Sequence, residues 1–399
     1  LYLFRQLTAR QSITANAVGT YINTNTSNYF DEGVPYKYDV KGRTASALTE
    51  VIYENKLKPF DFSAGLNYRY KYTKNDYLGD AYALTEMNNN NLYGFGEIKG
   101  MLKNFRYALG LGVSYIHYNQ NEHNYDFWTF RPKASLAYNF KNGMQLSYTL
   151  DLGDRASRIA MINDATIMTN SMEYTVGNPS LKPSRDMDQS LRLSYNNQRW
   201  STFIDGFYRY CYKPNMAHYE RTADDKFIYT QINQKEIDLL HIAAYASYWI
   251  LQEKLQASVY GGMQRCFNYG NDYSHFYTSW FCMGSITAYL GRFTLQAYAD
   301  NGNRFLEGEK RGYQGASVVL KGSYRYKDWN FSLAYYNPFC KKYKSNEGEI
   351  LNRDLHKLTT VYDKSSGNCL ILGVSWRMSH GSKYNSANKT LNNRDTDNG

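Results

Sequence analysis

The sequence predicts an all-β protein, a transmembrane antiparallel up-and-down β-barrel of which about sixteen strands are visible. Apolar and polar residues alternate with a period of two along most of the 399 residues. Short polar turns alternate with long polar segments, and aromatic residues, 17% of the chain, lie close to many strand ends. A helical membrane protein is excluded because no run of about 18 apolar residues occurs.

The alternation is clearest in five segments. In residues 62–72 every even-numbered residue is apolar or aromatic, and every odd-numbered residue is small or polar. Successive side chains of a strand point to opposite faces, so this sorting predicts a strand with one apolar face. The same sorting recurs, nearly complete, in residues 105–115, 144–152, 329–335 and 370–378.

The connections between these segments are of two kinds, which alternate along the chain. Tight periplasmic turns and long outer loops are typical of outer-membrane barrels. Short polar turns are predicted near residues 58–59, 103–104, 141–143, 197–198, 253–254, 291–292 and 327–328. Long polar loops are predicted at 76–89, 153–184, 216–235, 303–313 and 341–367, and loop 153–184 is expected to fold back into the lumen or to cover the mouth.

Sixteen strands follow from these turns and loops. Many exceed the roughly 9–11 residues that cross a bilayer, so their ends are expected to project beyond it. We assign residues 1–379 to the barrel segment and residues 380–399 to a polar C-terminal tail on the periplasmic side. The predicted strands are 12–30, 44–57, 60–75, 90–102, 104–119, 126–140, 144–152, 185–197, 199–215, 236–251, 255–269, 276–290, 292–302, 315–326, 328–338 and 368–378.

The chemistry-bearing residues indicate neither an enzyme nor a cofactor protein. The 7 histidines form no HxH or HxxxH pair and the 5 cysteines form no CxxC, so no metal site is expected. No GxSxG nucleophile motif occurs, and no catalytic residue is assigned. The net charge of +10 is dispersed over the chain, which does not favour nucleic acid as a partner.

One loop segment carries a resemblance to a known family. Residues Gly177, Asn178, Pro179, Ser180, Leu181, Lys182 and Pro183 precede a predicted strand. They resemble the GNPxLKPE motif of TonB-dependent outer-membrane receptors, although Ser184 stands where the motif has an acidic residue. The last two predicted strands and the closing run 386–397 are similar to the ends of related receptor-like outer-membrane β-barrel proteins.

The resemblance implies the cell outer membrane of a Gram-negative bacterium, with membrane lipids around the barrel. It implies a barrel of 22 strands, of which this chain is the C-terminal part, and a plug through which TonB acts. A surface lipoprotein is a further partner that it implies. The function implied is uptake of a scarce or large solute. A self-contained porin of sixteen strands and a surface binding protein anchored by its barrel remain alternatives.

Four basic residues on the polar faces of the predicted strands are candidates for contact with the solute: Arg69, Arg106, Arg192 and Arg325. A cationic lumen raises the local concentration of anionic solutes. Alternatively, these bases contact acidic residues of a plug or lipid phosphates near the rim.

Overall fold

The computed structural model describes residues 1–120, 123–155, 159–162 and 165–378, and it is nearly all β. The tail predicted at 380–399 lies outside the described residues. One short helix, α1 (Ile159–Ile162), occurs in a loop. In this part of the chain no helix has the length and apolar character needed to cross a membrane.

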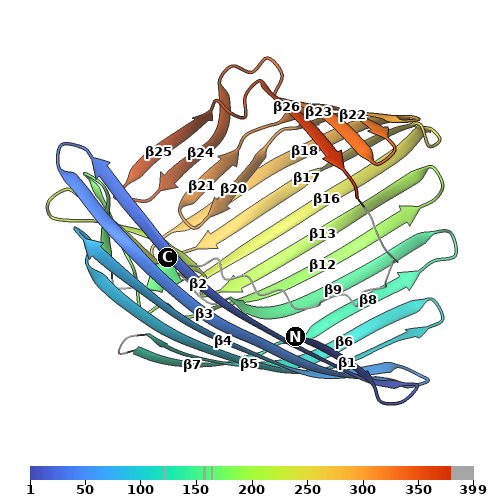
Figure 1. The fold of residues 1–399 in the computed structure, drawn as a ribbon, viewed down its shortest axis with the longest axis horizontal. Helices are drawn as coiled ribbons and strands as arrows, with labels where there is room; N and C mark the ends of the chain where they lie inside the picture. Colours follow the sequence, from blue (N-terminus) through green and yellow to red (C-terminus); the bar gives the residue numbers. More distant parts are fainter. Residues whose placement is uncertain (121–122, 156–158, 163–164, 379–399) are drawn as a thin grey trace.

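Eighteen strands form one large curved sheet, the wall (Figure 1). Most wall strands pair antiparallel with the wall strands that precede and follow them in the chain, as in an up-and-down barrel. The strands are β1 (Tyr2–Gln6), β2 (Gln11–Asp31), β3 (Pro35–Lys56), β4 (Asp61–Gly79), β5 (Ala83–Leu102), β6 (Phe105–Gln120), β7 (His123–Phe130), β8 (Lys133–Asn139), β9 (Met144–Arg155), β12 (Ser184–Asn196), β13 (Trp200–Tyr212), β16 (Glu236–Leu251), β17 (Leu255–Tyr269), β18 (Ser274–Leu290), β19 (Phe293–Asp300), β22 (Val318–Tyr326), β23 (Trp329–Tyr336) and β26 (Cys369–Trp376).

Each of the sixteen predicted strands corresponds to a wall strand, so the predicted fold class is confirmed. Strands β7 and β8 both pair with β6 and together fill the place of the predicted strand 126–140. The structure adds β1, which was not predicted. Strands β3 and β5 begin at Pro35 and Ala83, several residues before the predicted starts. The predicted loop 76–89 is therefore mostly paired strand, because polar residues beyond the bilayer still form a ladder.

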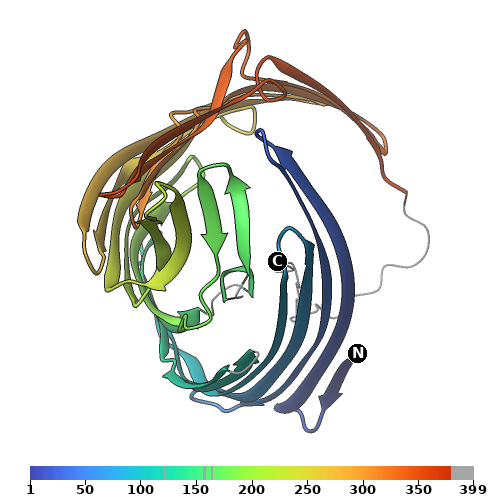
Figure 2. The same ribbon diagram turned by 90° about the vertical axis from the view of Figure 1, so that its left-hand side faces the viewer.

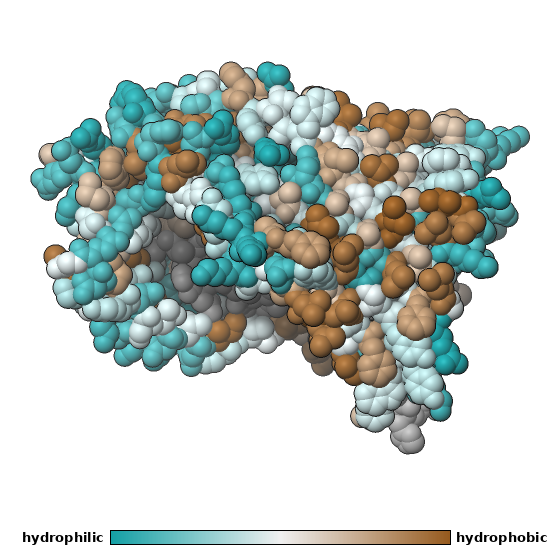
Figure 3. Space-filling view, turned by 90° about the horizontal axis from the view of Figure 1, so that it is seen from above, coloured by the Kyte–Doolittle hydropathy of each residue, from teal (hydrophilic) through white to brown (hydrophobic). Residues whose placement is uncertain are grey.

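The two faces of the wall differ as the alternation requires. Its outer face carries many exposed apolar side chains, for example Leu111, Leu191, Ile242, Val259 and Leu372. In Figure 3 apolar residues gather over the half of the wall toward the short turns, and hydrophilic residues dominate the end with the long loops. An apolar outer band of this kind is the surface that a transmembrane barrel presents to lipid.

Two of the long loops together form the first loop sheet, in the order β10-β11-β15-β14. Residues after β9 supply β10 (Thr166–Asn170) and β11 (Glu173–Val176). Residues after β13 supply β14 (Asn215–Arg221) and β15 (Phe227–Asn233). Figure 2 shows these green and yellow-green strands inside the curve of the wall.

Two further long loops form the second loop sheet, in the order β20-β21-β24-β25. Its strands are β20 (Asn303–Glu307), β21 (Lys310–Gln314), β24 (Tyr343–Leu351) and β25 (His356–Asp363). The sequence predicted these residues as loops because they lack an apolar face that spans a bilayer. They nevertheless pair, which saves the backbone polar groups from being left without partners.

The wall has two edges within the described residues. Strand β26 pairs with β23, and β1 pairs with β2. No described residue pairs β26 with β1 or β2. The sixteen predicted strands therefore do not close on one another.

Candidate functional site

The inner face of the wall carries all four predicted bases, each exposed. Backbone register places two of them in one row across four strands. Arg106 lies opposite Ala137, Ala137 opposite Ser147, and Ser147 opposite Arg192. Neighbouring strands lie about 4.8 Å apart, so the two bases are roughly 15 Å apart along the row. Arg69 and Arg325 lie on β4 and β22, away from this row.

The four bases differ in their surroundings. Arg192 donates to Asp205 Oδ2 at 3.1 Å, and its guanidinium lies 4.1 Å from the centre of the Phe203 ring. Arg106 lines a cavity of about 780 Å³ near the short turns, beside Lys99. Arg325 lines a separate cavity near the last short turn. The structure thus gives Arg192 a fixed partner and leaves Arg106 and Arg325 facing open space.

The motif 177–183 connects the first loop sheet to the wall. The Tyr118 hydroxyl donates to the Leu181 carbonyl at 2.7 Å, and the Tyr125 hydroxyl donates to the Pro179 carbonyl at 2.7 Å. On its other side, Asn178 Nδ2 donates to the Gln231 carbonyl of β15 at 2.8 Å. The motif is therefore a junction between wall strands β6 and β7 and the loop sheet.

The side chain of Leu181 completes this junction, with 0% of its surface exposed. It packs with Met87 of the wall and Ile162 of the loop. A second small core joins Val40 and Tyr77 of the wall to Ala165. The described part of loop 153–184 thus lies against the inner face of β3 to β6, in agreement with the expectation that it folds back into the lumen.

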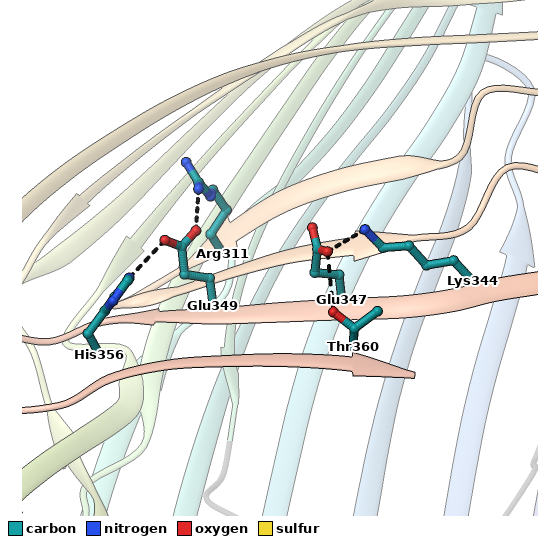
Figure 4. A network of polar contacts seen from close by, with 6 residues as sticks. All are labelled: Arg311, Lys344, Glu347, Glu349, His356 and Thr360. Carbon is teal, nitrogen blue, oxygen red and sulfur yellow. Dashed lines mark hydrogen bonds and ion pairs between the residues drawn. The ribbon is translucent and has the colours of Figure 1, made fainter. Parts of the chain in front are cut away.

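The second loop sheet presents a charged face toward the wall. Register places Arg311 opposite Glu349, and Tyr313 opposite Glu347, on one face of β21 and β24. Figure 4 shows the network on this face. It consists of Arg311 paired with Glu349, His356 in contact with Glu349 at 3.0 Å, Lys344 paired with Glu347, and Thr360 donating to Glu347 at 3.5 Å.

The electrostatics of this network favour the ionised form of Glu349. The contact with His356 is the largest influence on Glu349, and together with Arg311 it holds the pKa of Glu349 below its usual value. Charged partners stabilise the ionised form of an acid. Glu349 thus stays negative at neutral pH and keeps Arg311 in place.

A cavity of about 510 Å³ lies between this face and wall strand β18. The wall contributes Tyr277. The loop sheet contributes three basic residues, two acidic residues, a tyrosine and a glycine: Arg304, Arg311, Lys344, Glu347, Glu349, Tyr313 and Gly312. Sequence reasoning did not find these residues. Tyr277 lies in the predicted strand 276–290, but the loop-sheet residues fall in loops without periodicity. Only the pairing of β20, β21 and β24 brings those residues together.

The described residues contain no group of three or more His, Cys, Asp or Glu side chains that could hold a metal ion. The described residues of the inner face and the mouth include cations, tyrosine rings and paired carboxylates.

Comparisons with known proteins agree with this architecture. The model of the outer membrane protein beta-barrel family matches residues 5–376. No curated protein matches the chain. Among solved structures, the chain is similar to the copper transporter OprC, with a TM-score of 0.72 and 12% identity, over 93% of this chain and 63% of that one.

Two further similar structures are receptors or transporters of named bacteria. The ferric yersiniabactin uptake receptor FyuA from Yersinia pestis gives a TM-score of 0.59 at 10% identity, over 92% of this chain and 57% of that one. The FrpB iron transporter from Neisseria meningitidis gives 0.59 at 12% identity, over 91% and 63%. The chain thus spans about three-fifths of the length of these proteins and shares their fold. With the family model matched over nearly its whole length, the chain belongs to the outer membrane protein beta-barrel family and is a protein of the Gram-negative outer membrane.

Proposed function

We propose that this chain forms the barrel wall and the mouth of a receptor-like transporter, which takes up a scarce or large solute across the outer membrane. The observation that carries the proposal is the open wall. Strand β26 has only β23 as a partner among the described residues, and β2 is already paired with β1 and β3. A wall with these edges fits a larger barrel, in which further strands satisfy the edge groups that lipid cannot.

The open wall argues against the self-contained porin. A closed barrel of the sixteen predicted strands needs β2 to pair with β26. In the structure, β1 occupies that edge of β2 over Ser12 to Asn16. The similarity to OprC, FyuA and FrpB, all longer than this chain, supports the same conclusion.

The structure of the mouth supports selective uptake over passive flow. The first loop sheet lies inside the curve of the wall and is tied to it through the motif at 177–183 (Figure 2). This sheet occupies part of the space that the curve of the wall encloses (Figure 2). A receptor of this kind also contains a plug that TonB displaces. The exposed inner bases Arg69, Arg106 and Arg325 would contact either the solute or that plug.

Uptake into cells tests the proposal. Cells that produce the intact protein should accumulate its solute only when TonB is active, and the purified protein should show little steady conductance in planar bilayers. A large steady conductance that is independent of TonB would instead establish a porin. Surface binding of a solute without any uptake would establish a barrel-anchored binding protein.

A further inference from the structure

We infer that the cavity between the second loop sheet and β18 binds the carboxylate or phosphate group of an anionic solute, with Arg304 as its main contact. The inference deepens the proposed function, on which it rests, because it names the class of solute that the mouth accepts. It follows from three features of the cavity: an unpaired guanidinium, two further cations nearby, and a rigid frame.

The guanidinium of Arg304 is the feature that indicates an anion. It lies 4.6 Å from the centre of the Tyr313 ring, and no carboxylate in the described residues pairs with it. The other two cations of the cavity, Arg311 and Lys344, are each paired with a glutamate. Arginine binds carboxylate and phosphate through a planar fork of donors, so Arg304 is the group in this cavity that an added oxyanion can satisfy.

The lining of the cavity carries three cations and two carboxylates, so its net charge is positive. The ammonium of Lys344 lies 5.5 Å from the centre of the same Tyr313 ring, and Arg311 lies 5.8 Å from the centre of the Tyr277 ring. Tyrosine rings fix the cations above them through cation–π attraction. Three cations therefore lie against two rings. Glu347 and Glu349 offset part of their charge through the ion pairs with Lys344 and Arg311 that Figure 4 shows.

The frame of the cavity is held in place by the wall. The Ser279 hydroxyl of β18 donates to the Arg304 carbonyl at 2.9 Å, and Gln264 of β17 donates to the same oxygen. Tyr313 is fixed as well, because its hydroxyl accepts from the Ala316 amide at 3.1 Å. A site whose backbone is already ordered loses less conformational entropy when a ligand binds. A volume of about 510 Å³ has room for a solute of sugar size.

Binding to the intact protein in detergent micelles, measured by titration calorimetry, tests the inference. The probes are glucose 6-phosphate, gluconate and glucose, which share a carbon skeleton and differ in the phosphate, the carboxylate or neither. We expect the two anions to bind and glucose to bind at least tenfold more weakly. Tighter binding of one anion identifies phosphate or carboxylate as the preferred group.

Three variants separate the site from general charge effects. Arg304→Ala should weaken binding of the anions at least tenfold. Arg353→Ala is the control: Arg353 is an exposed base between β24 and β25 and does not line the cavity, so this variant should leave binding unchanged. Glu347→Gln frees Lys344 from its carboxylate and should strengthen binding several-fold. A loss of folding cannot produce such a gain.

Equal binding of all three probes, no binding by wild type, or unchanged anion binding in Arg304→Ala would each overturn the inference. Its failure is distinguishable from failure of the proposed function. If TonB-dependent uptake is unchanged in Arg304→Ala, only the inferred anion site is overturned. A steady conductance independent of TonB, with anion binding retained, would remove only the receptor function.

Discussion

Lys357 and Glu173 form an ion pair that joins the two loop sheets. Lys357 Nζ lies 2.6 Å from Glu173 Oε1 and 2.8 Å from Oε2, although the two residues are 184 positions apart in the sequence. Lys357 belongs to β25 and Glu173 to β11. The side chains are 42% and 20% exposed, so the pair is partly screened from water. It is a direct tie between loops from distant parts of the wall.

Breaking this pair should loosen the two sheets. We expect Lys357→Ala and Glu173→Gln each to speed hydrogen exchange in β11 and β25, with a coupling of about 1 kcal/mol in a double-mutant cycle. The Arg221–Asp225 pair is the control, since its side chains are 54% and 71% exposed and its coupling should be smaller. Equal coupling in the two cycles would show that Lys357–Glu173 is an ordinary surface pair.

The junction at Leu181 gives a second prediction. Leu181→Ala empties a fully buried position between Met87 and Ile162, and large-to-small changes in such cores cost about 3 kcal/mol. The loss of stability should appear as faster hydrogen exchange in β10 and β11, while the wall strands near the short turns keep their protection from exchange. Leu358→Ala is the matched control, because its side chain is 64% exposed. An unchanged first loop sheet in Leu181→Ala would contradict the role of the motif as a junction.

The wall could be predicted well from the sequence because alternate residues of a strand face lipid, where apolar side chains are favoured, and the lumen, where polar side chains are favoured. In β4, for example, Leu66 faces outward and Arg69 inward, and the sorting in residues 62–72 is visible without a structure. The predicted starts of β3 and β5 were wrong because these strands begin in the part of the wall that lies beyond the bilayer. Beyond the bilayer both faces are polar, so the pattern disappears although pairing continues.

The loop sheets could not be predicted for a related reason. Arg304 and Tyr313 pair across a local hairpin, whereas Tyr313 and Glu347 pair between two different loops. No local period announces this kind of pairing. The motif at 177–183 was recognised from its residues, yet only the contacts of Leu181 and Asn178 show that it holds loop to wall.

Acid should loosen the turn after β25. Asp363 accepts from the Ser365 hydroxyl at 2.6 Å, from the Ser366 hydroxyl and from the Ser365 amide at 2.8 Å, and these hydrogen bonds lower its pKa from 3.8 to about 2. Because the pKa of Asp363 is lower in the folded state, the ionised carboxylate stabilises the turn at pH values above the ordinary pKa of 3.8. That contribution is lost as the pH falls from 3.8 to about 2. Hydrogen exchange of residues 363–368 should therefore rise in this window after correction for intrinsic rates. Asp363→Asn should abolish the pH dependence, and a dependence that persists in this variant would assign it to another group.

The inner bases should divide into structural and solute-facing residues. Arg192→Ala leaves Asp205 without its ion-pair partner on the wall, and an unpaired, mostly buried carboxylate costs about 2 kcal/mol. We expect a lower urea midpoint for this variant in lipid vesicles, and Asp205→Asn should restore part of the loss. Arg69→Ala should leave the midpoint unchanged, since Arg69 is exposed and has no carboxylate partner among the described residues. If Arg69 contributes to the path of an anionic solute, its variant should slow uptake of that solute at unchanged stability. The opposite pattern, a stable Arg192→Ala and an unstable Arg69→Ala, would contradict this division of the lumen.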